Sequence, residues 1–163
     1  TIRAIRKHNP GVTIETLIPD FKGVEENLQR IIDVKPEVVS HNLETVSRLT
    51  REVRIQAKYE RSLDVLLKLK KGGIDRTKSG IMLGLGETES ELFEAMNDLR
   101  NAHVDILTLG QYLQPTRVHL PVARYVTPEN FNRYKEVALE KGFKVVESGP
   151  MVRSSYHAEK HVF

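Results

Sequence analysis

The 163-residue chain has no cysteine and no tryptophan, and only 6% of its residues are aromatic. Without cysteine it can form no disulfide, no thiolate metal site and no cysteine nucleophile. Its formal charge of +3 comes from 25 basic and 22 acidic residues scattered along the chain. This balance gives no argument for a nucleic acid or a membrane as partner. No apolar run approaches the length of a transmembrane helix.

The chain is long enough for one domain with a real core, and 39% of its residues are hydrophobic. Apolar runs predict strands at 12–17, 37–41, 79–85 and 104–109, and amphipathic patterns predict helices at 23–33, 57–71, 89–102 and 127–141. A short strand at 143–147 and a tail follow. This alternation is typical of parallel strands joined by right-handed crossovers.

We therefore predict an α/β fold in a single domain, residues 1–163. Four main strands are too few to close a barrel, so the fold is expected to be an incomplete (β/α) barrel. Residues 1–114 would supply its strands and helices, and residues 115–163 a C-terminal extension. Because residues 1–8 read as the end of a helix, we expect the chain to be the back part of a larger domain.

The stretch Thr77–Glu87, T-K-S-G-I-M-L-G-L-G-E, contains the most informative strand. Its apolar run lacks polar alternation, which is typical of a strand buried on both faces. Glycines 80, 84 and 86 would let a ligand approach the backbone. Thr88 and Glu91 form a capping-box pattern that predicts the start of the next helix. The stretch lacks the Gly-Lys-Ser/Thr order of a P-loop and the third glycine of a dinucleotide turn.

Polar residues or glycines follow each predicted strand, and parallel strands would bring them to one mouth. They are Asp20, then His41, Asn42 and Glu44, then Gly84, Gly86 and Glu87, then Gln111 and Gln114. Each one alone is more often a turn or helix-cap residue, and their convergence favours a site. No pair is spaced like a general acid and base. Asn42 and Glu44 suit hydrogen bonds to the hydroxyls of a polar ligand.

Six motifs carry a resemblance to a known family. They are E-T-L-I-P-D-F at 15–21, H-N-L-E-T at 41–45, Y-E-R-S-L at 59–63, T-K-S-G-I-M-L-G-L-G-E-T at 77–88, L-G-Q-Y-L-Q-P-T at 109–116 and G-P-M-V-R-S-S-Y-H-A at 149–158. In this order and spacing they resemble the lipoyl synthases, a family of radical S-adenosylmethionine enzymes. H-N-L-E-T alone also resembles biotin synthases, whereas Q-Y-L-Q-P and R-S-S-Y together are specific to lipoyl synthases.

The resemblance implies a partial (β/α)6 barrel whose third to sixth strands match the strands predicted here. It implies a [4Fe–4S] cluster that cleaves S-adenosylmethionine to a radical, which abstracts hydrogen from an octanoyl chain on a lysine of a carrier domain. A second, auxiliary [4Fe–4S] cluster donates the two sulfur atoms of the lipoyl group.

The resemblance also assigns the S-adenosylmethionine site. Asn42 and Glu44 match residues that hold the ribose hydroxyls and neighbouring polar groups, and Arg61 matches an arginine at the carboxylate. The glycine-rich strand is matched by Gly80, Met82, Gly84 and Glu87, with Met82 lining the adenine. The strand segment from Gln111 to Leu113 matches the backbone edge that meets the adenine.

The tail Arg153–Tyr156 matches a segment that returns to the barrel mouth and lends a serine oxygen to the auxiliary cluster. Ser155 is favoured over Ser154 as this metal ligand, and an alkoxide is a hard donor that suits a labile corner of a cluster. Without the resemblance, two serines near a C-terminus would read as a frayed tail.

One departure from the family is serious, because the family ligates its clusters through two cysteine triplets and this chain has no cysteine. We expect a C-terminal portion of the enzyme that is inactive alone. The alternative is a cluster-free binding module for the octanoylated carrier domain, with Arg117 and Arg124 near the mouth. The carrier would be of the glycine cleavage H protein or 2-oxoacid dehydrogenase E2 type. A barrel enzyme of aldolase or isomerase type lacks a supporting lysine–carboxylate pair. A cytoplasmic location is expected, or a mitochondrial one in a eukaryote.

Overall fold

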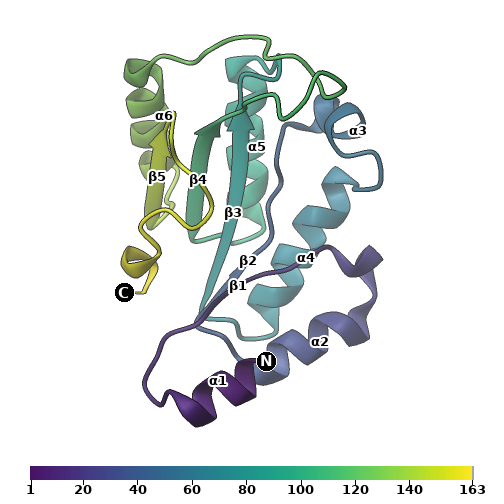
Figure 1. The fold of residues 1–163 in the computed structure, drawn as a ribbon, viewed down its shortest axis with the longest axis vertical. Coiled ribbons are helices and arrows are strands. Elements are labelled where there is room, and N and C mark those ends of the chain that lie inside the picture. Colours follow the sequence, from purple (N-terminus) through teal and green to yellow (C-terminus); the bar gives the residue numbers. More distant parts are fainter. Residues whose placement is uncertain (163) are drawn as a thin grey trace.

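The computed structural model describes residues 1–162, and they form one five-stranded parallel sheet with helices packed against it (Figure 1). The strands are β1 (Glu15–Leu17), β2 (Val38–Ser40), β3 (Arg76–Leu83), β4 (Ile106–Gln111) and β5 (Val145–Gly149). They pair in sequence order, so each connection crosses over to the next strand. β1 and β5 form the two edges, which confirms an α/β fold with an unclosed barrel. The short strand predicted at 143–147 extends this sheet as β5.

Within residues 1–162, six α-helices connect and flank the strands: α1 (Ile2–His8), α2 (Glu25–Val34), α3 (Thr50–Val53), α4 (Tyr59–Lys71), α5 (Glu89–Asn101) and α6 (Pro128–Glu140). The predicted capping box is present, because the Thr88 hydroxyl accepts from the Glu91 N–H and the Glu91 carboxylate accepts from the Thr88 N–H. Thr127 caps α6 through its hydroxyl alone, which accepts from the Asn130 N–H. These caps fix where both helices begin.

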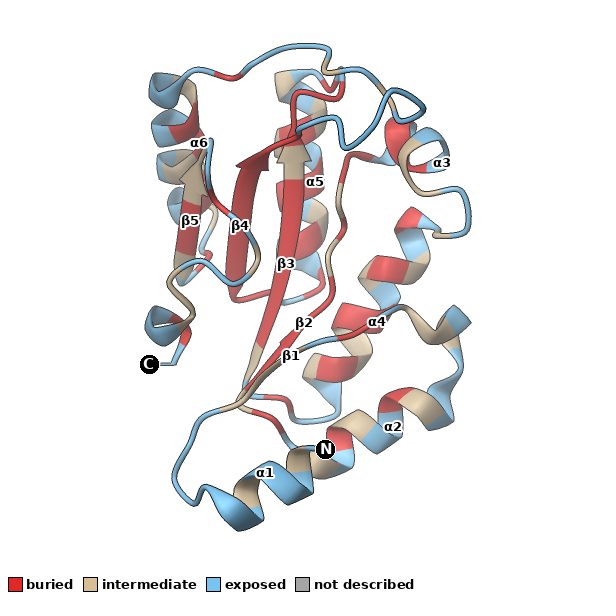
Figure 2. Ribbon diagram, in the orientation of Figure 1, coloured by how far each residue is buried: buried red, intermediate tan, exposed pale blue. Residues whose placement is uncertain are grey.

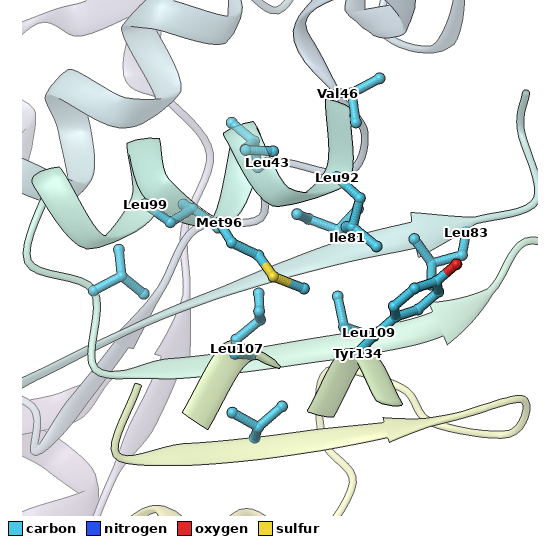
Figure 3. Packing of buried hydrophobic residues seen from close by; sticks show 14 of the residues in the cluster. Leu43, Val46, Ile81, Leu83, Leu92, Met96, Leu99, Leu107, Leu109 and Tyr134 are labelled. Carbon is cyan, nitrogen blue, oxygen red and sulfur yellow. The ribbon is translucent and has the colours of Figure 1, made fainter. Parts of the chain in front are cut away.

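The hydrophobic core lies on one face of the sheet, between the strands and the helices that pack against them. Because successive strand residues point to opposite faces, β3 and β4 present alternate leucines and isoleucines to α5 and α6 (Figure 3). The buried side chains of this region include Ile81, Leu83, Leu107, Leu109, Leu92, Met96, Leu99 and Tyr134. A second cluster joins α2 and α4 to β2 through Leu28, Ile32, Val65, Leu69 and Val39.

The opposite face of the sheet is the concave inner face of the partial barrel. Lys78, Gly80 and Met82 of β3 share this face, and the register pairs them with Ile106, Thr108 and Gly110 of β4. Gly80, Thr108 and Gly110 have small side chains or none, which leaves a hollow beside them. The segment that follows β5 crosses this face, and the largely exposed loop of residues 112–127 arches over the strand ends (Figure 2).

Among the helices within residues 1–162, none is both long enough and apolar enough to cross a membrane.

Candidate functional site

A cleft of about 850 Å³ opens at the carboxyl ends of β3 and β4. Six of the residues predicted for the site line it: Asn42, Glu44, Gly80, Met82, Gln111 and Leu113. The tail supplies a further wall through Val152, Arg153 and Ser154. The segments at the carboxyl ends of β2, β3 and β4 therefore meet at one hollow with the tail beside it, as expected of neighbouring parallel strands.

The segment after β2 is held against β3 so that Asn42 and Glu44 reach the cleft. The Glu44 N–H donates to the Gly80 carbonyl at 2.9 Å, and the Met82 N–H donates to the Glu44 carbonyl at 2.8 Å. Glu44 has a φ of 70°, a left-handed conformation that bends the chain there. Arg54 donates to the Asn42 carbonyl at 3.0 Å and supports the bend from behind.

Asn42 and Glu44 give the cleft its polar character. Within the described chain, the Oδ1 atom of Asn42 is buried and has no hydrogen-bond partner. Burial raises the pKa of the Glu44 carboxyl, while a hydrogen bond from Asn42 and the charge of Arg54 oppose that shift. An unsatisfied buried acceptor costs free energy until a donor reaches it. The pair is thus suited to accept hydrogen bonds from a bound hydroxyl-bearing ligand.

Two glycines set the shape of the cleft. A Cβ atom at Gly80 would lie 2.8 Å from the Thr108 hydroxyl oxygen and 3.1 Å from the Asn42 Oδ1 atom. A Cβ atom at Gly110 would collide with the Val152 carbonyl oxygen. The missing side chains therefore let the cleft walls and the tail come close to the sheet.

Gly84 and Glu87 lie outside the cleft lining, although the sequence placed them in the site. The Glu87 carboxylate is buried and accepts from the Gly84 and Leu85 N–H groups, each at 2.9 Å. Arg124 pairs with it at 3.2 Å. Gly84 has a φ of 97°, and the Arg124 carbonyl lies against it. The loop of residues 112–127 therefore occupies the space beside the Gly84 backbone.

The side chain of Gln111 is also engaged by this loop. Its Nε2 atom donates to the Tyr112 carbonyl at 2.9 Å and the Arg124 carbonyl at 3.1 Å, and its Oε1 atom accepts from the Val126 N–H at 2.9 Å. Gln111 thus orders the rim of the cleft, and Tyr112 adds a hydrogen bond from its hydroxyl to the Leu120 carbonyl at 2.8 Å.

Arg61 lies in a neighbouring hollow of about 890 Å³ rather than in the cleft. Its Nε atom contacts Asp20 at 2.7 Å, and its Nη2 atom donates to the Gln56 carbonyl at 2.8 Å. Burial of Asp20 would raise the pKa of its carboxyl, but the Lys22 N–H and Arg61 outweigh burial and lower it. Ile55 and Gln56 border both hollows, so the two are adjacent.

The two serines of the tail are placed differently. Ser154 lines the cleft, whereas Ser155 is exposed and lies outside the lining. The structure therefore brings Ser154 to the cleft, not the favoured Ser155.

No group of three or more histidine, cysteine, aspartate or glutamate side chains that could hold a metal ion occurs in residues 1–162. With cysteine absent from the whole sequence, the residues present do not fit an iron–sulfur cluster, which needs several thiolates. The cleft does fit an organic ligand, because its volume is in the range of small-molecule sites and it holds an unpaired acceptor on Asn42.

Sequence reasoning missed several residues at the cleft and beneath it. Thr108 and Gly110 line the cleft, and strand alternation from Gly80 and Met82 of the neighbouring strand would have found them. Lys78 was also missed, although a lysine inside a buried strand is itself a signal.

Comparison with solved structures shows the fold. SuiB from Streptococcus suis superposes with a TM-score of 0.65 at 12% identity, covering 90% of this chain and 34% of that one. Hydroxymethylglutaryl-CoA lyase from Pseudomonas aeruginosa gives a TM-score of 0.56 at 16% identity, covering 84% of this chain and 44% of that one.

The relatives found by sequence comparison are far more similar to this chain than these solved structures are. Curated relatives named lipoyl synthase include one from Flavobacterium johnsoniae and a mitochondrial one from Nematostella vectensis, each 65% identical over 162 residues. Each alignment covers 99% of this chain and 56% of the relative, so the chain spans little more than half the length of these proteins. The family described as the radical SAM superfamily matches residues 1–99, which is more than half of the chain. The chain therefore belongs to the radical SAM superfamily, and the two curated relatives described above are both named lipoyl synthase.

Proposed function

We propose that this chain is the C-terminal part of a lipoyl synthase, which inserts two sulfur atoms into an octanoyl group on a lysine of a carrier domain. The observation that carries the proposal is the 65% identity to lipoyl synthases over 99% of the chain. The arrangement of the cleft supports it, because predicted residues from three neighbouring segments and the tail line one hollow.

S-adenosylmethionine is the proposed ligand of the cleft. Asn42 and Glu44 would accept hydrogen bonds from its ribose hydroxyls, and Met82 and Leu113 would contact the adenine. Arg61 would meet the carboxylate from the adjacent hollow, sharing its guanidinium with Asp20. When bound and reductively cleaved, S-adenosylmethionine supplies an adenosyl radical. The work of these side chains is to hold the nucleoside in place and to exclude water from it.

Four further residues shape the proposed site without a proposed hydrogen bond to the ligand: Gly80, Gly84, Glu87 and Gln111. Gly80 keeps the cleft open, while Gly84, Glu87 and Gln111 fix the loop that forms its rim. Their contacts make them supports of the binding surface.

The two [4Fe–4S] clusters of the proposed enzyme would be held by cysteines that this chain lacks. We therefore propose that the chain alone has no lipoyl synthase activity. Within it, a tail serine is the proposed single ligand to the auxiliary cluster. Ser155 matches the family position, and Ser154 is the one that lines the cleft.

The proposed partner is an octanoylated carrier domain, of the glycine cleavage H protein or the 2-oxoacid dehydrogenase E2 type. Arg117 is exposed on the rim and would meet an acidic carrier, while Arg124 is partly engaged by Glu87. The enzyme would work in the bacterial cytoplasm, or in the mitochondrion of a eukaryote. The second candidate is a cluster-free module that only binds the carrier, favoured by the absence of cysteine.

The decisive experiment joins this chain to the N-terminal part of the Flavobacterium johnsoniae relative and reconstitutes iron and sulfide. We expect the joined protein to lipoylate an octanoylated H protein and the chain alone to be inactive. A joined protein that takes up clusters without lipoylating any carrier would refute the proposal. Tight binding of the octanoylated H protein by the chain alone would favour the binding module.

Variants of the joined protein test the site. Asn42→Ala removes an acceptor and should raise the KM for S-adenosylmethionine about three- to tenfold, the value of one neutral hydrogen bond. Asn97→Ala is the matched control, because Asn97 bonds to Lys141 on the exposed surface of α5. Ser154→Ala and Ser155→Ala, made separately, show which serine is required for sulfur insertion.

A further inference from the structure

Lys78 is fully buried on the inner face of β3, in the residue layer directly below Gly80. Lysine is almost never fully buried unless its ammonium group is paired. Neither the cleft lining nor the proposed site uses Lys78. A charge buried in this position needs an explanation from its partners.

Three groups surround the Lys78 ammonium. Its Nζ atom contacts the Glu15 carboxylate at 2.6 Å, donates to the Ser154 carbonyl oxygen, and lies 3.1 Å from the His161 Nδ1 atom. His161 is itself buried and also lies 3.1 Å from Glu15. Lys78 therefore joins the edge strand β1 and the central strand β3 to two points of the C-terminal segment.

The contact to Ser154 is what ties the network to the cleft. Upstream, the tail turns away from β5 through a hydrogen bond from the Val152 N–H to the Gly149 carbonyl at 3.1 Å. The Val152 carbonyl then lies where a side chain of Gly110 would be. Between this close approach and the Lys78 contact, Arg153 and Ser154 are held at the cleft wall.

We propose that Lys78 is a positioning residue that anchors the Val152–Ser155 segment to the floor of the cleft, with Glu15 as its counter-ion and His161 as its cover. The anchor acts through the backbone, because the ammonium binds the Ser154 carbonyl and leaves the serine side chains available. As far as it concerns what the serines do, the inference rests on the proposed function.

The charge makes this anchor stronger than an ordinary turn. A hydrogen bond from a charged donor is about twice as strong as a neutral one. If the Ser154 carbonyl moved away while His161 still covered Lys78, the buried ammonium would have one partner fewer, which is costly in a site away from water. Burial lowers the pKa of Lys78, and Glu15 opposes that shift. The ordered tail is therefore coupled to the pairing of Lys78 with β1.

The test uses hydrogen exchange of the 163-residue chain, followed by mass spectrometry of peptides from the tail and the core. Lys78→Met alone would leave the Glu15 carboxylate without its counter-ion. The informative variant is therefore Lys78→Met with Glu15→Gln, which removes both charges. We expect β3 and β4 to keep native protection and residues 152–156 to exchange at least about tenfold faster, as loss of the charged hydrogen bond to the Ser154 carbonyl predicts. Lys71→Met, on the exposed end of α4, is the matched control and should change neither region.

Tail exchange within twofold of the native chain in the double variant would overturn the proposal. Loss of protection in β3 and β4 would also overturn it, because Lys78 would then support the sheet and not the tail. This measurement needs neither clusters nor S-adenosylmethionine, so it stands apart from the proposed function. If the joined enzyme with native Lys78 lipoylates no carrier while the tail still loosens in the double variant, the proposed function fails and the anchor stands.

Discussion

Replacing Glu87 by glutamine changes one atom of a buried carboxylate that organises the turn after β3. Both of its oxygens accept backbone N–H groups, from Gly84 and Leu85, at 2.9 Å each, and Arg124 adds a contact at 3.2 Å. In Glu87→Gln one oxygen becomes an NH2 group, which cannot accept from the N–H that faces it. The other bond loses its charge assistance. The change is nearly isosteric, so packing stays as it is.

The expected cost follows from these contacts. Hydrogen bonds to a charged group contribute about 1.5–3 kcal/mol, and leaving a buried N–H unsatisfied costs a similar amount. The half-exposed Arg124 contact adds little, since exposed ion pairs are worth about 0–1 kcal/mol. We therefore expect Glu87→Gln to lower the free energy of unfolding by about 2–3 kcal/mol. At about 2–4 °C per kcal/mol for a chain of this size, Tm should fall by about 4–12 °C.

The assay is urea unfolding of the 163-residue chain followed by circular dichroism, with the m-value unchanged between variants. Glu89→Gln is the matched control, because Glu89 lies two residues away and pairs with Arg133 on the surface. It should change stability by less than about 1 kcal/mol. A Glu87→Gln protein that unfolds within about 0.5 kcal/mol of the native chain, or no earlier than Glu89→Gln, would refute the reasoning.

Two further predictions concern the glycines that follow β3 and the buried His41 that follows β2. Gly84→Ala should lower the free energy of unfolding by more than about 2 kcal/mol, because its Cβ would collide with the Arg124 carbonyl at a φ of 97°. Gly86→Ala should lower it by about 1–2 kcal/mol in urea unfolding, because its φ is 105° but the nearest neighbour lies 3.8 Å away. Equal losses would contradict this. Burial lowers the pKa of His41 below its ordinary 6.5, so the unfolded chain binds a proton more readily than the folded one. The stability that neutral His41 contributes to the folded chain is present above about pH 6.5 and is lost as pH falls through the folded pKa. His41→Gln should flatten the fall in urea midpoint between pH 7.5 and 5 relative to the native chain, whereas exposed His8→Gln should not.

The order and type of the main elements could be predicted from sequence, because they depend on local signals. Thr88 and Glu91 marked the start of α5, Thr127 and Pro128 that of α6, and the apolar run around Ile81 the central strand. The expected boundaries differ from the observed ones by a few residues, as at β1, which is shorter than the run 12–17. Strand ends depend on pairing with a neighbour, which a single segment does not encode.

The site was predictable to the extent that strand ends define it. Asn42, Glu44, Gly80 and Met82 reach the cleft because parallel strands place their carboxyl ends together. The chemistry of Asn42 and Glu44 and their position after a strand were legible in the chain, and Gly80 and Met82 could be read as part of the central strand. The direction of each side chain at the rim could not be predicted, and the Glu87 carboxylate binds the backbone N–H groups of the turn that precedes it.

The sequence by itself therefore determined the α/β alternation, the parallel sheet and the strand ends that meet at one mouth. Only the tertiary structure decided which polar groups face that mouth and which pair with other residues of the chain. Arg61 pairs with Asp20 in an adjacent hollow, and Lys78 joins Glu15 to the Ser154 carbonyl, 76 residues further along the chain. The reason is physical: periodicity fixes which face a side chain takes, whereas partners distant in sequence fix what it binds.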